Sequence, residues 1–410
     1  MQFVCLLCNR LVSYTFIEVH KQVYHPEFSG YGMMWPNSYN VPQSRNLMKI
    51  PIYESEILAE TLNVEKVWIR DEGQNLSGSM KDYSTERAVK LAKEAGYRKV
   101  MVVSCGNHAF SLARYAALEG LDAICFTPSS SSKIPHLAAM ENVTVVALND
   151  AIFEDVYRLS ADLVLDGVYN ANVSNEELLP GFSPIVEDLS TNDIQPDYIL
   201  AGAGNGSYLA GIILAYQELG RFMPKILPVG MSGAFPVSQA FANDLMIHEH
   251  NDFLEEEALI DAAEGSIAVA SYSMPQLIHA MKLSDGQPLG GLLNDNLAEA
   301  YRCLNLDQNL ISRGVIPEPT GIMGLASVMK DNDFFKPEDK VMVSFTGNGM
   351  KDLDGIRRLA PNLADGFEEK LCQSRPDLKV EASGVVLGKV IYIAKETTKE
   401  ELKRVLEGGT

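Results

Sequence analysis

The sequence predicts an α/β protein with largely parallel sheet, and three observations carry this prediction. Between Leu47 and Gly349, short β-branched runs alternate with amphipathic segments, the pattern of strands joined by helices. Glycine follows several amphipathic segments, where a left-handed residue suits the end of a helix. Apolar residues make up 46% of the 410 residues and charged residues 21%, which is an ordinary globular composition. A chain of this length exceeds one compact core, so two or more domains are expected.

The expected elements follow in order along the chain. The strands are Lys66–Arg70, Lys99–Ser104, Asp122–Thr127, Val143–Ala147, Tyr198–Ala201, Lys225–Met231 and Lys340–Phe345. The helices are Asp82–Glu94, Ala109–Glu119, Lys133–Met140 and Ser207–Leu219, with Gly96, Gly120 and Gly220 after three of them. From about Pro361 the chain reads as a separate α/β piece, with a strand at Val385–Ala394 and a charged helix from Lys399 to Leu406.

Charge and hydropathy exclude some functions. The formal net charge is −20, which repels phosphate backbones, so we expect no nucleic-acid partner. No run of 18 apolar residues appears, and the start lacks the basic region and apolar run of a secretory signal. We therefore expect a cytoplasmic protein that does not enter a membrane. An anionic cofactor can still bind, because helix N-termini attract anions locally.

The segment from Asn75 to Asp82 is a polar turn that ends with Lys81 at the start of an expected helix. The positive end of the helix dipole, together with partial burial, favours the uncharged amine of this lysine. An uncharged lysine amine can form an imine with an aldehyde. By itself, however, the segment favours the simpler interpretation, a surface lysine that opens a helix.

A glycine-rich turn, Ala201-Gly202-Ala203-Gly204-Asn205-Gly206-Ser207, follows one expected strand and opens a helix. Glycines let the backbone approach an anion closely, and the helix start supplies N–H donors, so the turn suits a monophosphate. In a dinucleotide-binding fold this turn would follow the first strand, whereas here several strands come before it. A tight turn that needs glycine only for its shape is the simpler alternative.

Two more strands end in small polar residues. Ser104-Cys105-Gly106-Asn107-His108 follows one, and Thr346-Gly347-Asn348-Gly349 follows another. In open α/β sheets, ligands bind at the carboxyl ends of the strands. Four such turns in one chain are stronger evidence for a ligand site than any one of them.

Together these segments resemble the threonine synthase branch of the fold-type II pyridoxal-phosphate enzymes, which also include the tryptophan synthase β chain. The matching segments are Ser79-Met80-Lys81-Asp82, Gly106-Asn107, Gly202–Ser207 and Thr346-Gly347-Asn348-Gly349-Met350-Lys351-Asp352, within about Asn46 to Arg358. The resemblance implies two open, twisted, mainly parallel sheets flanked by helices. It also implies a large cofactor-binding domain of residues 31–95 and 176–360, a small domain of residues 96–175, and a C-terminal α/β extension of residues 361–410.

The resemblance further implies a role for each matching position. Lys81 would carry pyridoxal 5'-phosphate as a Schiff base and then move the α-proton of an amino-acid substrate. Asn107 would hydrogen-bond the phenolic oxygen of the cofactor, and Thr346 would face the pyridine nitrogen. Residues that cradle the phosphate would be Gly202, Ala203, Gly204, Asn205, Gly206 and Ser207. Residues near the substrate would be Ser104, Cys105, His108 and Asn175.

The sequence departs from the threonine synthases at positions that concern the substrate. Where they usually have an arginine for the substrate phosphate, this chain reads Asn175-Glu176-Glu177-Leu178-Leu179-Pro180-Gly181, with leucine at the arginine position. Carboxylates repel phosphate, which an arginine fork would bind. Tyr83 replaces another usual arginine, and Gly-Asn-His-Ala around His108 is more like the amino-acid dehydratases. We therefore expect β- or γ-elimination or replacement on an amino acid other than O-phosphohomoserine.

The first 30 residues predict a small zinc-finger-like module. Cys5, Cys8, His20 and His25 have the spacing Cys-x2-Cys-x11-His-x4-His, one residue short of a two-cysteine, two-histidine finger. Four ligands would make the zinc structural, because no position remains for water. A cysteine pair with two unrelated surface histidines is the alternative.

Three functions compete. The first is an active lyase or transferase, commonly a homodimer in this family, with a serine or threonine dehydratase-like ammonia-lyase as its nearest variant. The second is a non-catalytic binding protein that kept the fold, and the third is a nucleotide-binding enzyme supported by the glycine-rich turn alone. The first is favoured by the combination of Lys81, Asn107, the glycine-rich turn and Thr346, because a binding protein needs no Schiff-base lysine.

Overall fold

The computed structural model describes residues 2–4, 11–13, 50–104, 106–131, 134–160, 163–243, 262–266, 273–378 and 388–407. Contacts divide the chain into two compact units, each built from separate stretches of sequence. Unit 1 comprises Met1–Asn37, Lys81–Gly181 and Val380–Thr410, and unit 2 comprises Ser38–Met80 and Phe182–Lys379. The chain therefore passes from unit 2 into unit 1 at the peptide bond between Met80 and Lys81.

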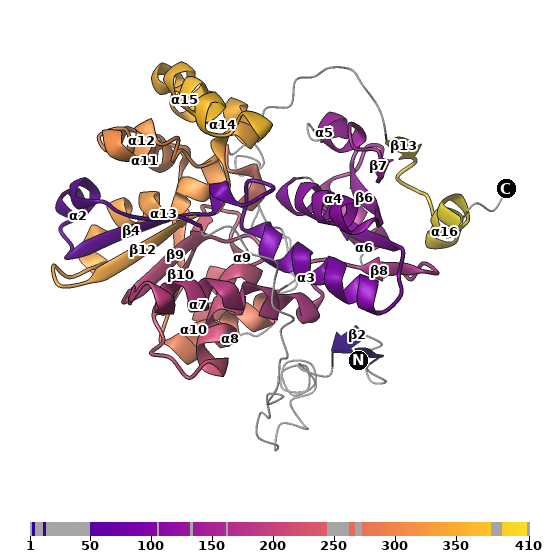
Figure 1. The fold of residues 1–410 in the computed structure, drawn as a ribbon, viewed down its shortest axis with the longest axis horizontal. Helices are drawn as coiled ribbons and strands as arrows, with labels where there is room; N and C mark the ends of the chain where they lie inside the picture. Colours follow the sequence, from indigo (N-terminus) through magenta and orange to yellow (C-terminus); the bar gives the residue numbers. More distant parts are fainter. Residues whose placement is uncertain are drawn as a thin grey trace. The chain divides into compact units, whose positions relative to one another are not determined.

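Unit 2 is built on a six-stranded sheet in the order β11-β10-β9-β12-β4-β3. Figure 1 labels its strands β4, β12, β9 and β10. Its strands are β3 (Ile52–Glu54), β4 (Lys66–Asp71), β9 (Tyr198–Gly202), β10 (Lys225–Met231), β11 (Leu289–Leu292) and β12 (Lys340–Phe345). Within this sheet β3 runs antiparallel to β4, and the other neighbouring strands pair in parallel. Parallel strands covered on both faces read as continuous apolar runs, which is why β12 carries Val341, Met342 and Val343 in succession, all buried.

The α-helices of unit 2 are α2 (Glu56–Leu62), α7 (Ser183–Thr191), α8 (Ser207–Glu218), α9 (Pro236–Ala242), α10 (Met274–Ser284), α11 (Asn294–Leu304), α12 (Gln308–Ser312), α13 (Pro319–Lys330), α14 (Leu353–Leu359) and α15 (Pro361–Ser374). Its short 3₁₀ helices are η3 (Glu72–Gln74), η6 (Glu264–Ser266), η7 (Asn332–Phe334), η8 (Gly349–Asp352) and η9 (Pro376–Leu378). Helix α13 packs directly on β9 and β12. The approach is close at Gly324, where a Cβ would lie 2.8 Å from a methyl group of Val343.

Unit 1 contains an all-parallel five-stranded sheet in the order β13-β7-β6-β5-β8. Its strands are β5 (Lys99–Val103), β6 (Asp122–Pro128), β7 (Val143–Leu148), β8 (Val168–Asn170) and β13 (Lys389–Ile393). Its helices are α3 (Lys81–Glu94), α4 (Asn107–Glu119), α5 (Ile134–Ala138), α6 (Phe153–Ser160), η4 (Glu176–Phe182) and α16 (Lys399–Glu407). Two short antiparallel strands, β1 (Gln2–Val4) and β2 (Leu11–Ser13), form a separate hairpin.

The core of unit 1 lies between its sheet and the helices α3 and α4. Buried alanines such as Ala92 and Ala113 let the two helices approach each other and the strands closely, while Val100, Val102 and Leu112 fill the space between. Small residues at a helix–helix contact allow this close packing at native density. The result fixes the first residues of α3 and α4 relative to each other within the unit.

The structure confirms the α/β class and the mainly parallel sheets. Strands β10 and β12 have the expected bounds, and the other expected strands of the two sheets are reproduced within a few residues of their ends. Gly96, Gly120 and Gly220 adopt positive φ angles of 81°, 72° and 60°, as helix ends require.

The contacts group three parts of the chain differently from the expected domains. Strand β13 pairs in parallel with β7, so it completes the sheet of unit 1 and does not form a separate piece. The division by contacts assigns Lys81–Glu94 to unit 1 because α3 packs on α4, whereas the expected domains placed it with the large domain. It also assigns α15 to unit 2. None of the described helices is both long and apolar enough to cross a bilayer.

Candidate active site

Three neighbouring parallel strands of unit 2, β9, β12 and β4, lead into the predicted site segments. The glycine-rich turn follows β9, Thr346 follows β12, and the lysine segment follows β4 through η3. Because parallel strands end at the same edge of a sheet, these three segments lie at one edge of unit 2. Sequence spacing alone could place each segment after a strand, but only the strand order makes them neighbours.

The lysine segment runs beside the residues that follow β12. The amide of Met80 donates to the carbonyl oxygen of Thr346 at 2.9 Å, and the amide of Asn348 donates to the carbonyl oxygen of Gly78 at 2.9 Å. Gly78 has φ +75°, which only glycine adopts readily, so the turn depends on it. Lys81 follows Met80 directly. The segment up to Met80 is thus held beside the residues after β12, among them Thr346, which is 3% exposed.

The glycine-rich turn has the geometry of an anion cradle. Gly206 has φ +78° and precedes α8, and the start of this helix has no side-chain cap. A Cβ on Gly202 would lie 2.5 Å from the carbonyl oxygen of Thr320, and a Cβ on Gly206 would lie 2.3 Å from Leu277. Glycine is thus required at both positions. A helix start left uncapped by side chains presents backbone N–H groups and the positive end of the helix dipole to an anion.

A buried polar network lies beneath these segments and joins all three. Glu72, which is fully buried, accepts hydrogen bonds from Nε of Arg70 at 2.8 Å and from the hydroxyl of Tyr208 at 2.9 Å. Its second carboxylate oxygen accepts from the amide of Asn75 at 2.6 Å. The hydroxyl of Tyr208 also lies 3.1 Å from Oγ of Ser344. Tyr208 belongs to α8, Ser344 to β12 and Asn75 to the lysine segment. The carboxylate of Glu72 therefore links the three segments, directly to Asn75 and Tyr208 and through Tyr208 to Ser344.

The buried charge of Glu72 is compensated by a buried cation, Arg70. Arg70 is 2% exposed and also donates from Nη1 to Asp188 at 2.6 Å. A buried carboxylate without a cation would be strongly destabilising, so Arg70 and Glu72 depend on each other. In the sequence, this network is indicated only by two charged residues, Arg70 and Glu72, within three positions after the apolar run Val67–Ile69.

Unit 1 carries Lys81 and Asn107 at the first positions of two adjacent helices. Asp82, fully buried at the start of α3, accepts a hydrogen bond from the hydroxyl of Ser111 on α4 at 2.5 Å. The hydroxyl of Thr85 lies 2.5 Å from the same Ser111 oxygen. This small network ties the start of α3 to α4. It therefore fixes the lysine and the asparagine relative to each other within unit 1.

His108, the second residue of α4, is buried at 4% exposure, and neither ring nitrogen hydrogen-bonds another described residue. Burial, together with the nearby positive charge of Lys81, lowers the pKa of His108 from 6.5 to about 3, and the polar backbone of Ala171 offsets a part of this. The imidazole is therefore neutral at ordinary pH. A buried ring with polar atoms left unpaired is the kind of group that a bound ligand completes.

Two other predicted substrate residues, Ser104 and Asn175, differ in their surroundings. Oγ of Ser104 accepts from the amide of Gly106 at 3.2 Å, just before the uncapped start of α4. The amide nitrogen of Asn175 donates to Tyr169 and to the backbone of Asn170, and its oxygen accepts from the amide of Glu177. These contacts shape a turn, so a substrate role for Asn175 stays a prediction.

The position expected to hold a phosphate-binding arginine is occupied by a core residue. Leu178 is 3% exposed and belongs to the apolar cluster of unit 1. Arg87 of α3 instead donates to the backbone oxygen of Glu177. A buried leucine provides no donor to a substrate phosphate, so the departure seen in the sequence is also a departure in structure.

Cys5, Cys8, His20 and His25, the predicted zinc ligands, and Cys105 lie outside the described residues. Within the described ranges no three His, Cys, Asp or Glu side chains are grouped as a metal site. The zinc module therefore stays a prediction. Cys125 and Cys303 are buried free thiols, and Cys372 is a partly exposed one.

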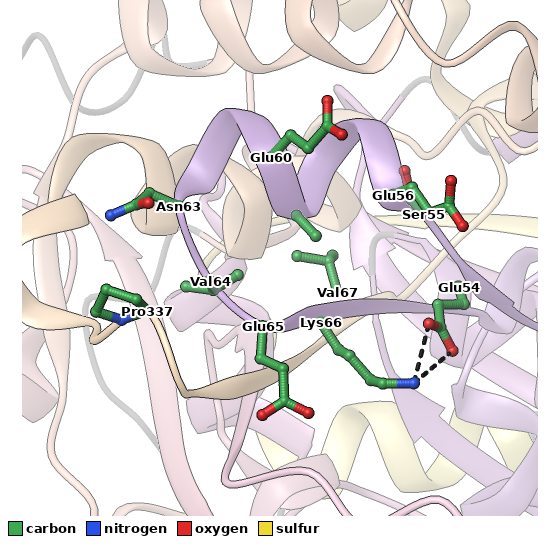
Figure 2. A pocket seen from close by; sticks show the side chains of 11 residues that line it. Glu54, Ser55, Glu56, Glu60, Asn63, Val64, Glu65, Lys66, Val67 and Pro337 are labelled. Atoms are coloured by element: carbon green, nitrogen blue, oxygen red, sulfur yellow. Dashed lines mark hydrogen bonds and ion pairs between the residues drawn. The ribbon is translucent and has the colours of Figure 1, made fainter.

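A surface pocket of about 480 Å³ lies elsewhere on unit 2, where α2 meets β4 (Figure 2). Glu54, Glu56, Glu60 and Glu65 surround it, and its one lysine, Lys66, pairs with Glu54 at 3.0 Å. Carboxylates repel a phosphate, and none of the predicted site residues lines the pocket. It is therefore separate from the candidate active site.

Each unit supplies residues that fit pyridoxal phosphate. Unit 2 has an anion cradle and a buried hydroxyl residue, and unit 1 has a lysine at a helix start and an imidazole that hydrogen-bonds no other described residue. The sequence profile of the family described as "Pyridoxal-phosphate dependent enzyme" matches residues 44–347. The threonine synthase of Methanocaldococcus jannaschii is 24% identical over 322 residues, which cover 75% of this chain and 76% of that protein. The threonine synthase of Synechocystis is 26% identical over 350 residues, covering 82% and 84%.

Solved structures share the fold. An L-serine ammonia-lyase from Rhizomucor miehei superposes with a TM-score of 0.62 at 19% identity, covering 79% of this chain and 99% of that one. A threonine deaminase from Solanum lycopersicum gives a TM-score of 0.61 at 16% identity, covering 77% and 88%. The match of the family profile to about three quarters of the sequence, with its segments on neighbouring strand ends, shows that the chain belongs to the pyridoxal-phosphate dependent enzymes.

Proposed function

We propose that this chain catalyses β- or γ-elimination or replacement on an amino acid, with pyridoxal 5'-phosphate held by Lys81. The observation that carries the proposal is the set of three adjacent strand ends in unit 2 that bear the glycine-rich turn, Thr346 and the segment leading to Lys81. When bound, the cofactor supplies an electron sink for the bonds at the substrate α-carbon. Relatives named as threonine synthases support the same class of reaction.

Each of these residues has a defined task in the proposal. The amide groups at the start of α8, with Gly204 to Ser207, bind the phosphate. Thr346 would direct a hydroxyl to the ring nitrogen, and because a hydroxyl cannot hold a proton there as a carboxylate would, elimination and replacement would be favoured. Asn107 would donate to the phenolic oxygen. Lys81 would hold the cofactor and would move the proton at the substrate α-carbon.

The substrate that fits best carries no phosphate of its own. Leu178 offers no donor, and Glu176 and Glu177 beside it add negative charge. A dehydratase-like ammonia-lyase acting on serine or threonine is the second candidate, and one observation favours it. His108 presents a neutral imidazole after Gly106-Asn107, and the uncapped start of α4 beside it suits a substrate carboxylate.

The test begins with the visible absorbance of purified protein given pyridoxal phosphate. We expect an absorbance band from the lysine-bound cofactor that is lost in Lys81→Ala and kept in Lys90→Ala. Lys90 is a matched control because it lies on the same helix, where Nζ pairs with Glu86 at 2.5 Å. A wild-type protein that binds no cofactor would refute the proposal and favour a non-catalytic descendant.

Substrate class is tested by a screen in which serine, threonine and O-phosphohomoserine are compared by spectral change and product analysis. We expect kcat/KM for O-phosphohomoserine to be lower than for the best unphosphorylated amino acid. Conversion of O-phosphohomoserine to threonine as the preferred reaction would contradict the inference from Leu178. Size-exclusion chromatography with light scattering tests the expected homodimer.

A further inference from the structure

Arg375 lies beyond the residues that match the family profile, yet it reaches back to the segment that leads to Lys81. It directly follows α15 and is 8% exposed. Its amide donates to the carbonyl oxygen of Leu371 at 2.8 Å, which ends the helix and fixes the start of the side chain. Both Arg375 and the lysine segment up to Met80 belong to unit 2.

All five N–H donors of the Arg375 guanidinium are used. Nη1 donates to the carbonyl oxygens of Gly73 at 2.7 Å and Asn75 at 3.0 Å, and Nη2 donates to that of Leu76 at 3.2 Å. The other two donors, on Nε and Nη2, bind the two carboxylate oxygens of Asp377 at 2.9 Å each. A guanidinium has five donors in one rigid plane, so the complete set fixes its orientation.

Neighbouring residues hold the same segment from other sides. The methyl of Leu378 occupies the space beside Gly78, where a Cβ would lie 2.6 Å from it. Nζ of Lys351 donates to the carbonyl oxygen of Ser77 at 3.0 Å. Gly73 also accepts from Nδ2 of Asn348 at 3.4 Å and Asn75 from the amide of Gly78 at 2.8 Å, whereas the bonds to Leu76 and Ser77 come from Arg375 and Lys351. Buried carbonyls without a donor are costly, and the segment would rearrange if Arg375 were lost.

We propose that Arg375 is a positioning residue that holds the Gly73–Met80 segment, and through it Lys81, in the geometry that cofactor attachment and α-proton transfer require. The inference rests on the proposed function for its catalytic consequence, but the structural part can be tested without any cofactor. The amide of Met80 is bonded to Thr346 and the amide of Gly78 to Asn75, so both report on the order of the segment. Arg375 is not a catalytic residue in this scheme, because it touches only protein backbone and Asp377.

The first experiment compares Arg375→Met with Arg357→Met by hydrogen exchange in the cofactor-free protein. Arg357 is a matched control because its guanidinium bonds only side chains, those of Asp354 and Glu368 on the surface. We expect exchange of the amides of Gly78 and Met80 to become at least ~10-fold faster in Arg375→Met, as the loss of about one charged hydrogen bond implies. Exchange in the strands of the unit 1 sheet should not change. Exchange at Gly78 and Met80 equal to that of the control would overturn the proposal.

The second experiment adds pyridoxal phosphate and the best amino-acid substrate. In Arg375→Met we expect the cofactor dissociation constant to rise at least ~10-fold and kcat to fall, with KM for the amino acid changed less than ~2-fold. A purely structural role would lower thermal stability without this separation of kcat from KM. Normal cofactor affinity and kcat in a variant with faster exchange would also overturn the positioning role.

The outcomes separate the two proposals. If wild-type protein binds no cofactor, the proposed function fails, while hydrogen exchange still decides whether Arg375 orders the segment. If Arg375→Met does not fold, Arg375→Lys replaces it under the same criteria. Lysine keeps the charge but has at most three donors and no planar fork, so we expect exchange between that of wild type and an unrestrained segment. Wild-type exchange in Arg375→Lys would overturn the proposal.

Discussion

Removing one hydroxyl from the buried network of unit 2 tests whether Glu72 coordinates the site segments. The change is Tyr208→Phe, which deletes the donor to Glu72 at 2.9 Å and the contact with Ser344 at 3.1 Å. The ring itself stays, and with it the edge-to-face contact with Phe182 at 5.6 Å between centroids. The experiment therefore isolates the hydroxyl.

The expected loss of stability follows from the hydrogen bonds that Glu72 keeps in the variant. Glu72 keeps Nε of Arg70 at 2.8 Å and the amide of Asn75 at 2.6 Å, so the charge is still compensated. The loss is that of one hydrogen bond to a charged group, about 1.5–3 kcal/mol. For a unit of this size, such a loss lowers Tm by roughly 3–10 °C.

The assay is thermal and urea unfolding of Tyr208→Phe beside Tyr216→Phe. Tyr216 lies on the same helix and is buried at 5% exposure, but its hydroxyl bonds no described residue. We expect the free energy of unfolding to fall by at least ~1 kcal/mol more in Tyr208→Phe than in Tyr216→Phe. Cofactor affinity should fall with it, because Tyr208 follows the phosphate turn. Equal losses in the two variants would refute the reasoning.

Three further predictions concern groups with perturbed environments. His108, with a folded-state pKa of about 3 against 6.5 unfolded, takes up its proton first in the unfolded chain, so stability should fall by roughly 2–3 kcal/mol between pH 7 and pH 4.5. His108→Gln should flatten that slope in unfolding experiments, and an unchanged slope would contradict the burial argument. Burial raises the pKa of Asp71 to about 6. Ionised Asp71 therefore lowers the stability of the folded protein, and this loss is absent below pH 3.8 and complete above pH 6. Asp71→Asn should therefore gain about 2–2.5 kcal/mol relative to wild type on going from pH 4 to pH 8, and a constant difference would exclude this. Gly206→Ala should weaken cofactor binding and stability far more than Gly220→Ala, because both have positive φ but only the former meets a neighbour, Leu277 at 2.3 Å. Equal effects in titration and melting would contradict the cradle geometry.

Local pattern was enough to predict most of the sheet. Strands such as β10 and β12 are short apolar runs with both faces buried, and their bounds follow from hydropathy alone. The glycines that end α3, α4 and α8 are local as well. For the site, the segments around Lys81, Gly202–Ser207 and Thr346 were each recognisable from a few consecutive residues.

Contacts between distant residues could not be predicted in this way. Arg70 and Asp188 are 118 positions apart, and Arg375 and Gly73 are 302 apart. Nothing in the sequence near Arg375 distinguishes it from a surface arginine at the end of a helix. Strand β3 was missed because it has only three residues, and its pairing with β4 is decided by the neighbouring strand. The residues that hold the site segments from distant parts of the sequence could therefore be identified only in the tertiary structure.

The pairing of β13 with β7 has a consequence for how the protein is made. Residues 81–181 leave the ribosome well before residues 389–393, with most of unit 2 translated in between. During that time one side of β7 has no partner strand, and such edges favour association with other chains. We infer that the nascent chain needs protection at β7 until its partner strand emerges. The sheet of unit 1 therefore cannot be completed before residues 389–393 have been translated.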